Sequence, residues 1–148
     1  MGAAGSPSLT ITVGAMNSSV LLQVGKPGAH KSDPNDPTSL QDVFFRIGGA
    51  AAGKATTSLV VNSDDVILDD IWAWRADHGN GVGWAVNTAD TGVVVNGDDV
   101  TAYGLFVEHY QKYNVIWNGE NGTTVFFQNG LLLNASMIRP RARSLSAM

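Results

Sequence analysis

The sequence predicts an all-β fold, a right-handed parallel β-helix of about five coils, and three observations lead to this prediction. One short strand pattern recurs five times along the 148 residues. A second pattern, three apolar residues followed by asparagine, precedes the first in several of these units. No window sustains the i, i+3, i+4, i+7 spacing of an amphipathic helix, so the repeats are read as strands.

The recurring strand reads apolar, aromatic or leucine, apolar, and then a larger residue that is usually polar. Its copies are Val20-Leu-Leu-Gln-Val24, Val43-Phe-Phe-Arg-Ile47, Ile71-Trp-Ala-Trp-Arg75, Leu105-Phe-Val-Glu-His109 and Val125-Phe-Phe-Gln-Asn129. They start about 20 to 34 residues apart, a period typical of solenoids, in which each unit buries its apolar face against the next. The longer intervals are then loops inserted into the unit.

The second strand of each unit ends in an asparagine corner. Its copies are Leu59-Val-Val-Asn62, Val93-Val-Val-Asn96 and Val115-Ile-Trp-Asn118. We expect the three amides to stack and to hydrogen-bond to one another from coil to coil. Acidic pairs follow at the corners, at 64–65, 69–70 and 98–99, and Asx turns explain them. Calcium binding by these carboxylates is the alternative explanation. Apart from calcium, no cofactor is expected.

Alternation along the recurring strand predicts which side chains form the core. The first and third positions face inward, namely Val20, Leu22, Val43, Phe45, Ile71, Ala73, Leu105, Val107, Val125 and Phe127. We expect one β-helix domain at residues 8–133, cut at both ends from a longer helix. Residues 134–148, with three arginines, are expected to form a disordered basic tail, of which 137–148 are dispensable.

Composition excludes several function classes. The formal net charge is −4, and much of the positive charge lies in the tail, which argues against nucleic-acid binding. No stretch approaches the roughly 20 apolar residues of a membrane span. The absence of cysteine excludes disulfides and Cys-bound metals, and we expect a monomer.

Three long runs resemble a known family: Asp69 to Trp84, Asn87 to Gly92, and Gly104 to Tyr113. They resemble the β-helix region of large secreted actinobacterial and fungal proteins labelled coagulation factor 5/8 type domain proteins. That region is similar to pectate-lyase-like and glycoside hydrolase family 55 (exo-β-1,3-glucanase) domains. The resemblance covers most of residues 8 to 130 and departs after Asn129. It implies a pectin-lyase-like solenoid, an extracellular location and a polysaccharide partner.

The second and fourth positions of the recurring strand should face outward and stack about 4.8 Å apart along the helix. The second positions are Leu21, Phe44, Trp72, Phe106 and Phe126, and the fourth are Gln23, Arg46, Trp74, Glu108 and Gln128. Flat rings beside polar groups suit a sugar. The predicted substrate-binding residues are Trp72, Trp74, Arg46, His78, His109 and Trp84. The alternative is that the inserted loops simply cover these rings.

Two acids are the candidate catalytic residues. Glycoside hydrolysis uses two carboxyl groups roughly 5 to 9.5 Å apart. Glu108 lies in the outward stripe beside Trp74, and Asp77 lies in the longest inserted loop, Ala76 to Thr91. His78 and His109 follow these acids directly and could orient a water molecule.

Two function classes stay open at this point. One is a fragment of a secreted carbohydrate-active enzyme, a glycoside hydrolase or lyase, that is inactive by itself. The other is a non-catalytic β-helix that binds glycan or serves as a scaffold. Nucleotide binding lacks a phosphate loop that is followed by a helix.

Overall fold

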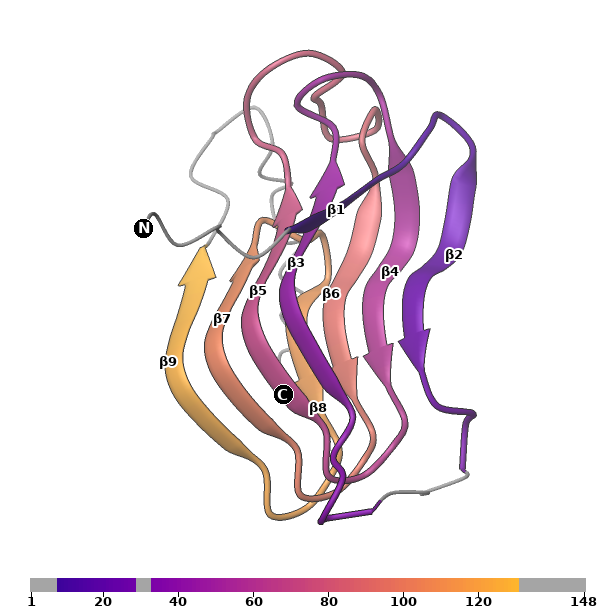
Figure 1. Ribbon diagram of the computed structural model, residues 1–148. Helices are drawn as coiled ribbons and strands as arrows, with labels where there is room; N and C mark the ends of the chain where they lie inside the picture. The colour runs from indigo at the N-terminus through magenta and orange to yellow at the C-terminus, as the bar shows by residue number, and fades with distance from the viewer. Residues whose placement is uncertain (1–7, 29–32, 131–148) are drawn as a thin grey trace, which may run out of the picture.

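A computed structural model describes residues 8–28 and 33–130 of the chain, and this part is built from parallel strands. In chain order they are β1 (Leu9–Thr12), β2 (Asn17–Val24), β3 (Ser39–Ile47), β4 (Lys54–Val61), β5 (Ile67–Arg75), β6 (Ala89–Val95), β7 (Thr101–Glu108), β8 (Tyr113–Trp117) and β9 (Thr123–Gly130). Odd strands form a five-stranded sheet, β1-β3-β5-β7-β9, and even strands form a four-stranded sheet, β2-β4-β6-β8 (Figure 1). The predicted parallel β-helix is confirmed.

The chain alternates between the two sheets, so each coil contributes one strand to each (Figure 1). Every strand pair is parallel, for example Ile71 beside Leu105 in the odd sheet and Leu59 beside Val93 in the even sheet. The loops that leave β3 and β5 rise together from one end of the helix. No helix in the described ranges is long and apolar enough to cross a membrane.

The core lies between the sheets and is made of inward-facing aliphatic side chains. Six of the ten predicted core residues are buried: Val43, Phe45, Ile71, Ala73, Leu105 and Val107. Val20 and Leu22 are only partly buried. Val125 and Phe127 are 50% and 45% exposed, because β9 is an edge strand of the described sheet and Val125 is out of the predicted register.

The alignment of the first copy of the recurring strand was wrong. Val20 to Val24 belong to β2, in the even sheet, where Gln23 pairs with Val60. Leu21 accordingly packs against the core and does not continue the outward ladder. The odd sheet instead receives β1 on this side, with Thr10 beside Phe44 and Thr12 beside Arg46.

The alignment of the last copy was wrong by two residues. Phe127, not Val125, pairs with Leu105, and Gln128 pairs with Phe106. The reason is a bend present in each long odd strand, where one residue has positive φ: Asp42, Asp70, Gly104 and Phe126. Asp and Gly are typical of this left-handed conformation. Phe126 is not, so the sequence hides the bend. The residues on both sides of the bend belong to one strand, as in β5, which runs from Ile67 to Arg75.

The predicted asparagine stack is confirmed. Asn96 Nδ2 donates to Asn62 Oδ1, and Asn118 Nδ2 donates to Asn96 Oδ1, each at 2.8 Å. A second ladder runs beside it, since the Asp64 and Asp98 carboxylates each accept from a backbone N–H of the next coil. The proposed end of the domain at 133, the tail at 134–148 and the expected disorder of 137–148 lie outside the described residues.

Candidate functional site

Two columns of side chains cover the outer face of the odd sheet at its middle. Register places Arg46 beside Trp74 and Trp74 beside Glu108. In the neighbouring column Phe44 lies beside Trp72, and Trp72 beside Phe106. Side chains of these second and fourth positions point away from the core, because the first and third positions are buried. The outward stripe predicted over these three strands is present.

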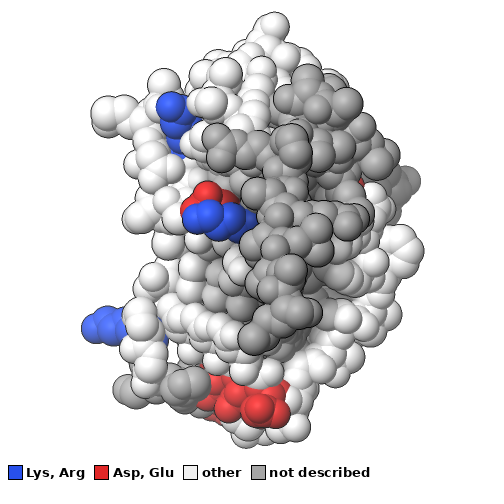
Figure 2. Space-filling view, turned by 180° about the vertical axis from the view of Figure 1, so that it is seen from behind, with Lys and Arg blue, Asp and Glu red and all other residues white. Residues whose placement is uncertain are grey.

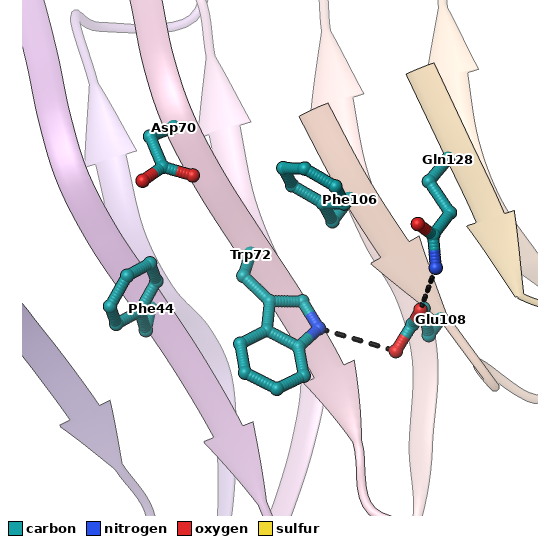
Figure 3. A pocket seen from close by; sticks show the side chains of 6 residues that line it. All are labelled: Phe44, Asp70, Trp72, Phe106, Glu108 and Gln128. Carbon is teal, nitrogen blue, oxygen red and sulfur yellow. Dashed lines mark hydrogen bonds between the residues drawn. The ribbon is translucent and has the colours of Figure 1, made fainter. Parts of the chain in front are cut away.

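A cavity of about 310 Å³ opens on this face, and its polar centre is Glu108. Trp72 Nε1 donates to Glu108 Oε2 at 3.2 Å, and Gln128 Nε2 donates to Glu108 Oε1 at 2.7 Å (Figure 3). The remaining walls are Phe44, Phe106 and Asp70. Both carboxylate oxygens therefore accept a hydrogen bond, while apolar rings form most of the surface around them.

An aromatic run extends from this cavity toward the long loop. Trp72 stacks on Trp74 with ring centroids 5.6 Å apart and planes 25° apart. The Trp74 and His78 ring centroids are 5.2 Å apart. The Phe44 and Trp72 rings pack edge to face, with centroids 6.2 Å apart. Trp72 is 39% exposed, so part of its indole is open to a ligand.

Asp77 and the two histidines form a cluster at the end of this run. His78 Nδ1 lies 2.8 Å from Asp77 Oδ1, and His109 Nδ1 lies 3.7 Å from the same oxygen. Partial burial acts to raise the pKa of Asp77, but the hydrogen bond from His78 and the attraction of His109 outweigh it and hold this pKa below its ordinary value. Asp77 is therefore a charged carboxylate at neutral pH.

His109 is more enclosed than its neighbours in the cluster. Its side chain is 14% exposed, against 78% for His78, and its buried Nδ1 has no hydrogen-bond partner among the described residues. Glu108, Trp72, Trp74, His78 and Asp77 thus form a series of successive contacts. The series closes at His109, which contacts Asp77 and directly follows Glu108 in the sequence.

A second cavity, of about 270 Å³, lies on the other side of Trp72. Arg46 and Trp74 line it, together with Thr10, Phe44 and Phe45. It shares the Phe44 and Trp72 side chains with the first cavity, so the two form one trough across neighbouring strands. Arg46 is the guanidinium group predicted for this surface, and it lies at the end of the trough away from Glu108.

Trp84, the remaining predicted site residue, lies against Arg75. The Arg75 guanidinium carbon is 5.6 Å from the centroid of the Trp84 ring. The Trp84 carbonyl accepts from Gln111 Nε2 at 2.8 Å. No described contact joins Trp84 to Trp72 or Trp74.

Arg75 is a functional candidate that the sequence analysis missed. It is fully buried, and its guanidinium donates to the backbone carbonyls of Asn87, His109, Gly83 and Trp84. Desolvation by burial lowers its pKa to about 10, so it remains charged at neutral pH. Inward alternation at position 75, one residue after the outward Trp74, was the available signal.

Asp70 is a second missed residue, and it lines the Glu108 cavity. Its positive φ of 52° marks the bend of β5. Desolvation raises the pKa of Asp70, and a hydrogen bond and charge repulsion from Asp42 on the next strand add to this. The stacking of two bends on adjacent strands, which brings the carboxyl groups together, could have been found from the aligned repeats.

On the face opposite to the view of Figure 1, the Lys, Arg, Asp and Glu side chains that can be seen form a few separate groups (Figure 2). Among residues 8–28 and 33–130, no cluster of three or more His, Cys, Asp or Glu side chains could hold a metal ion.

Comparison with known proteins gives consistent matches. The LAM55 pectate lyase-like domain matches residues 4–130. An exo-beta-1,3-glucanase of Streptomyces sp. (strain SirexAA-E / ActE) is 61% identical over 121 residues, which are 82% of this chain and 20% of that protein. The solved structure of sacteLam55A from Streptomyces sp. SirexAA-E has 60% identity and a TM-score of 0.81, over 83% of this chain and 23% of that one.

A variant of sacteLam55A, solved in complex with glucose, gives the same identity and TM-score and is covered over 22% of its length. This chain therefore spans about a fifth of the length of the relatives that it matches.

Proposed function

The chain belongs to the LAM55 pectate lyase-like domain family, and from this premise we propose that its odd sheet forms part of the sugar-binding face of a polysaccharide-degrading protein. The proposed substrate is a β-1,3-glucan, the class named for the Streptomyces relative. The observation that carries the proposal is the Trp72–Glu108 contact, which joins an exposed indole and a carboxylate in one open cavity. Sugar sites combine such an apolar face with a few polar groups.

The binding roles follow from the trough on both sides of Trp72. Trp72 and Trp74 offer ring faces to the pyranose, and His78 extends this platform. Arg46 donates to hydroxyl groups at the far end of the trough. His109 is assigned to the site through its contact with the Asp77 carboxylate. Trp84 is assigned to the loop that forms one wall of the site, which it supports through its contact with Arg75.

The catalytic roles are assigned to Glu108 and Asp77. The lowered pKa of Asp77 suits a base or nucleophile, because that group must be charged. Glu108, whose two oxygens are held by Trp72 and Gln128, is then assigned the role of proton donor. This pair follows the two-carboxyl scheme of glycoside hydrolases.

The wider setting is also part of the proposal. We assign the protein to an extracellular location, as a monomer that needs no cofactor, in keeping with the resemblance to secreted coagulation factor 5/8 type domain proteins. Its partner is a polysaccharide, and neither nucleic acid nor a membrane is assigned to it.

A non-catalytic glycan-binding role is the second candidate, and one observation favours it. Both oxygens of Glu108 are already hydrogen-bonded, and Asp77 is held in its charged form by His78. Carboxylate oxygens can accept hydrogen bonds from sugar hydroxyl groups without any cleavage of the glycosidic bond.

A chimera tests the catalytic proposal. The 121 residues of this chain that match the Streptomyces exo-beta-1,3-glucanase would replace the corresponding segment of that enzyme, and glucose release from a β-1,3-glucan would be measured. The Glu108→Gln chimera should lose about 10²-fold or more in kcat while still binding the glucan. An unchanged rate in Glu108→Gln would leave only the binding role.

A further inference from the structure

Arg75 is a buried cation that donates its hydrogen bonds to backbone carbonyls. It ends β5, one residue after Trp74, and its side chain has no exposed surface. Nε donates to Asn87 O at 2.7 Å, Nη1 to His109 O at 3.2 Å and Nη2 to Gly83 O at 3.2 Å. Burying a charge is costly unless it is well bonded, and an apolar side chain of similar size would avoid that cost. The guanidinium fixes the positions of these three carbonyl groups relative to β5.

The hydrogen bond from Arg75 to the carbonyl of His109 is the one that bears on the candidate site. His109 follows Glu108 directly and has φ of 66°, in the left-handed region that few side chains adopt. Its N–H donates to Gly130 O at 3.0 Å, and its carbonyl accepts from Arg75. The unusual backbone conformation is thus held from both sides, as expected where surrounding structure imposes strain near a functional group.

This bend sets the direction of the Glu108 side chain. Glu108 reaches Trp72 Nε1 and Gln128 Nε2 from the last residue of β7, immediately before the bend (Figure 3). β5 therefore acts on Glu108 twice. Trp72 donates to the carboxylate, and Arg75, three residues later, holds the backbone that follows it.

We propose that Arg75 is a positioning residue of the candidate site, which aims the Glu108 carboxylate by clamping the bend at His109. The functional meaning of this aim rests on the proposed function. The clamp itself does not depend on the proposed function, and the experiment that tests it uses no sugar.

The Trp72 indole N–H reports on Glu108, because it donates to Glu108 Oε2. In the ¹⁵N-labelled 148-residue chain, its NMR signal is the one missing in Trp72→Phe. The signal should change position in Glu108→Gln, because that variant replaces the carboxylate that accepts from the indole N–H. In Arg75→Lys the signal should move at least half of the way toward its position in Glu108→Gln, since lysine cannot make the forked contacts.

Asn87→Ala is the matched control. Asn87 is equally buried and holds the same loop, with Nδ2 donating to Ile47 O and Ala76 O, and neither of these hydrogen bonds involves residue 108 or 109. It should lower the melting temperature and leave the Trp72 signal as in the wild type. A Trp72 signal at its wild-type position in Arg75→Lys, or the same displacement of the signal in Asn87→Ala, would overturn the proposal.

Two further variants decide the question if Arg75→Lys does not fold. His109→Asn keeps a residue that tolerates positive φ, whereas the β-branched His109→Val resists it. We expect His109→Val to shift the Trp72 indole signal from its wild-type position and His109→Asn to leave it in place. Equal shifts in the two variants would show that the bend does not aim Glu108. If the indole signal behaves as expected but no glucan binds, the clamp is correct and the proposed function is wrong.

Discussion

At the scale of single residues, Asp42 and Asp70 show how two bends on adjacent strands can raise the pKa of a carboxyl group by bringing it close to another. The pKa of Asp70 is raised by desolvation, then by the hydrogen bond and charge of Asp42. A raised folded-state pKa gives stability that is fully present below the unfolded value, near 3.8, and is lost as pH rises through the folded value. The cavity wall at Asp70 is therefore more easily protonated than an ordinary aspartate.

Asp42→Asn should lower the pKa of Asp70, because it removes the neighbouring charge. The measurement is the ¹³C carboxyl titration of Asp70 by NMR. Asp36→Asn, in an exposed turn, serves as the control and should leave the Asp70 midpoint in place. A midpoint that stays the same in Asp42→Asn would mean that the charge of Asp42 does not contribute to the raised pKa of Asp70.

The asparagine ladder depends on its middle member. Asn96→Ala removes a donor to Asn62 and an acceptor for Asn118. We expect a loss of about 1–3 kcal/mol in the free energy of unfolding, because the amide oxygen of the buried Asn62 loses its donor. Urea denaturation measures it, with Asn35→Ala in an exposed turn as the control. Equal midpoints in the two variants would show that the ladder adds no stability.

At the scale of the strands, the bend of each long odd strand is a backbone requirement. Gly104 has φ of 64°, and a Cβ at this position would meet nothing closer than 3.6 Å, so space is not limiting. Gly104→Ala should therefore cost about 1–2 kcal/mol through backbone conformation alone. Gly104→Asn should cost less, since asparagine tolerates this conformation. Thermal denaturation compares them, and the reverse order would refute the account.

Inward and outward alternation gives a second prediction for β7. Leu105 is 1% exposed, so Leu105→Ala should cost about 2–5 kcal/mol. Thr101, on the same strand, is only half-buried, and Thr101→Ala should cost far less. Chemical denaturation of the two variants is the measurement. Equal losses would place the register one residue away from that described.

The strands also show where sequence reasoning succeeded and failed. Three copies of the recurring strand were aligned correctly, because each follows an aspartate or glycine at the bend: Asp42, Asp70 or Gly104. The copy at Val20 has a similar apolar pattern, but both sheets need inward aliphatic residues, so pattern could not assign the sheet. The last copy slipped because Phe126 occupies the bend without the usual residue type.

At the scale of the whole molecule, parallel stacking converts a periodic sequence into a continuous face. The placement of Trp72, Trp74 and Glu108 together was predictable, since one register fixes all three. The Asp77 cluster was predictable only as a neighbour in the chain. Its contact with His109 depends on the path of the loop, and the loop is anchored by Arg75 and Asn87 through carbonyl groups that carry no sequence signal.

The central claim is that this face binds a β-1,3-glucan chain, and calorimetric titration of the 148-residue protein with a laminari-oligosaccharide tests it most directly. Trp74→Ala should weaken binding by about tenfold, which corresponds to about 1.4 kcal/mol of lost stacking. Tyr103→Ala, an exposed aromatic residue on the same sheet that lines neither cavity of the trough, should bind as the wild type does. No binding by the wild type, or equal affinities in the two variants, would contradict the account.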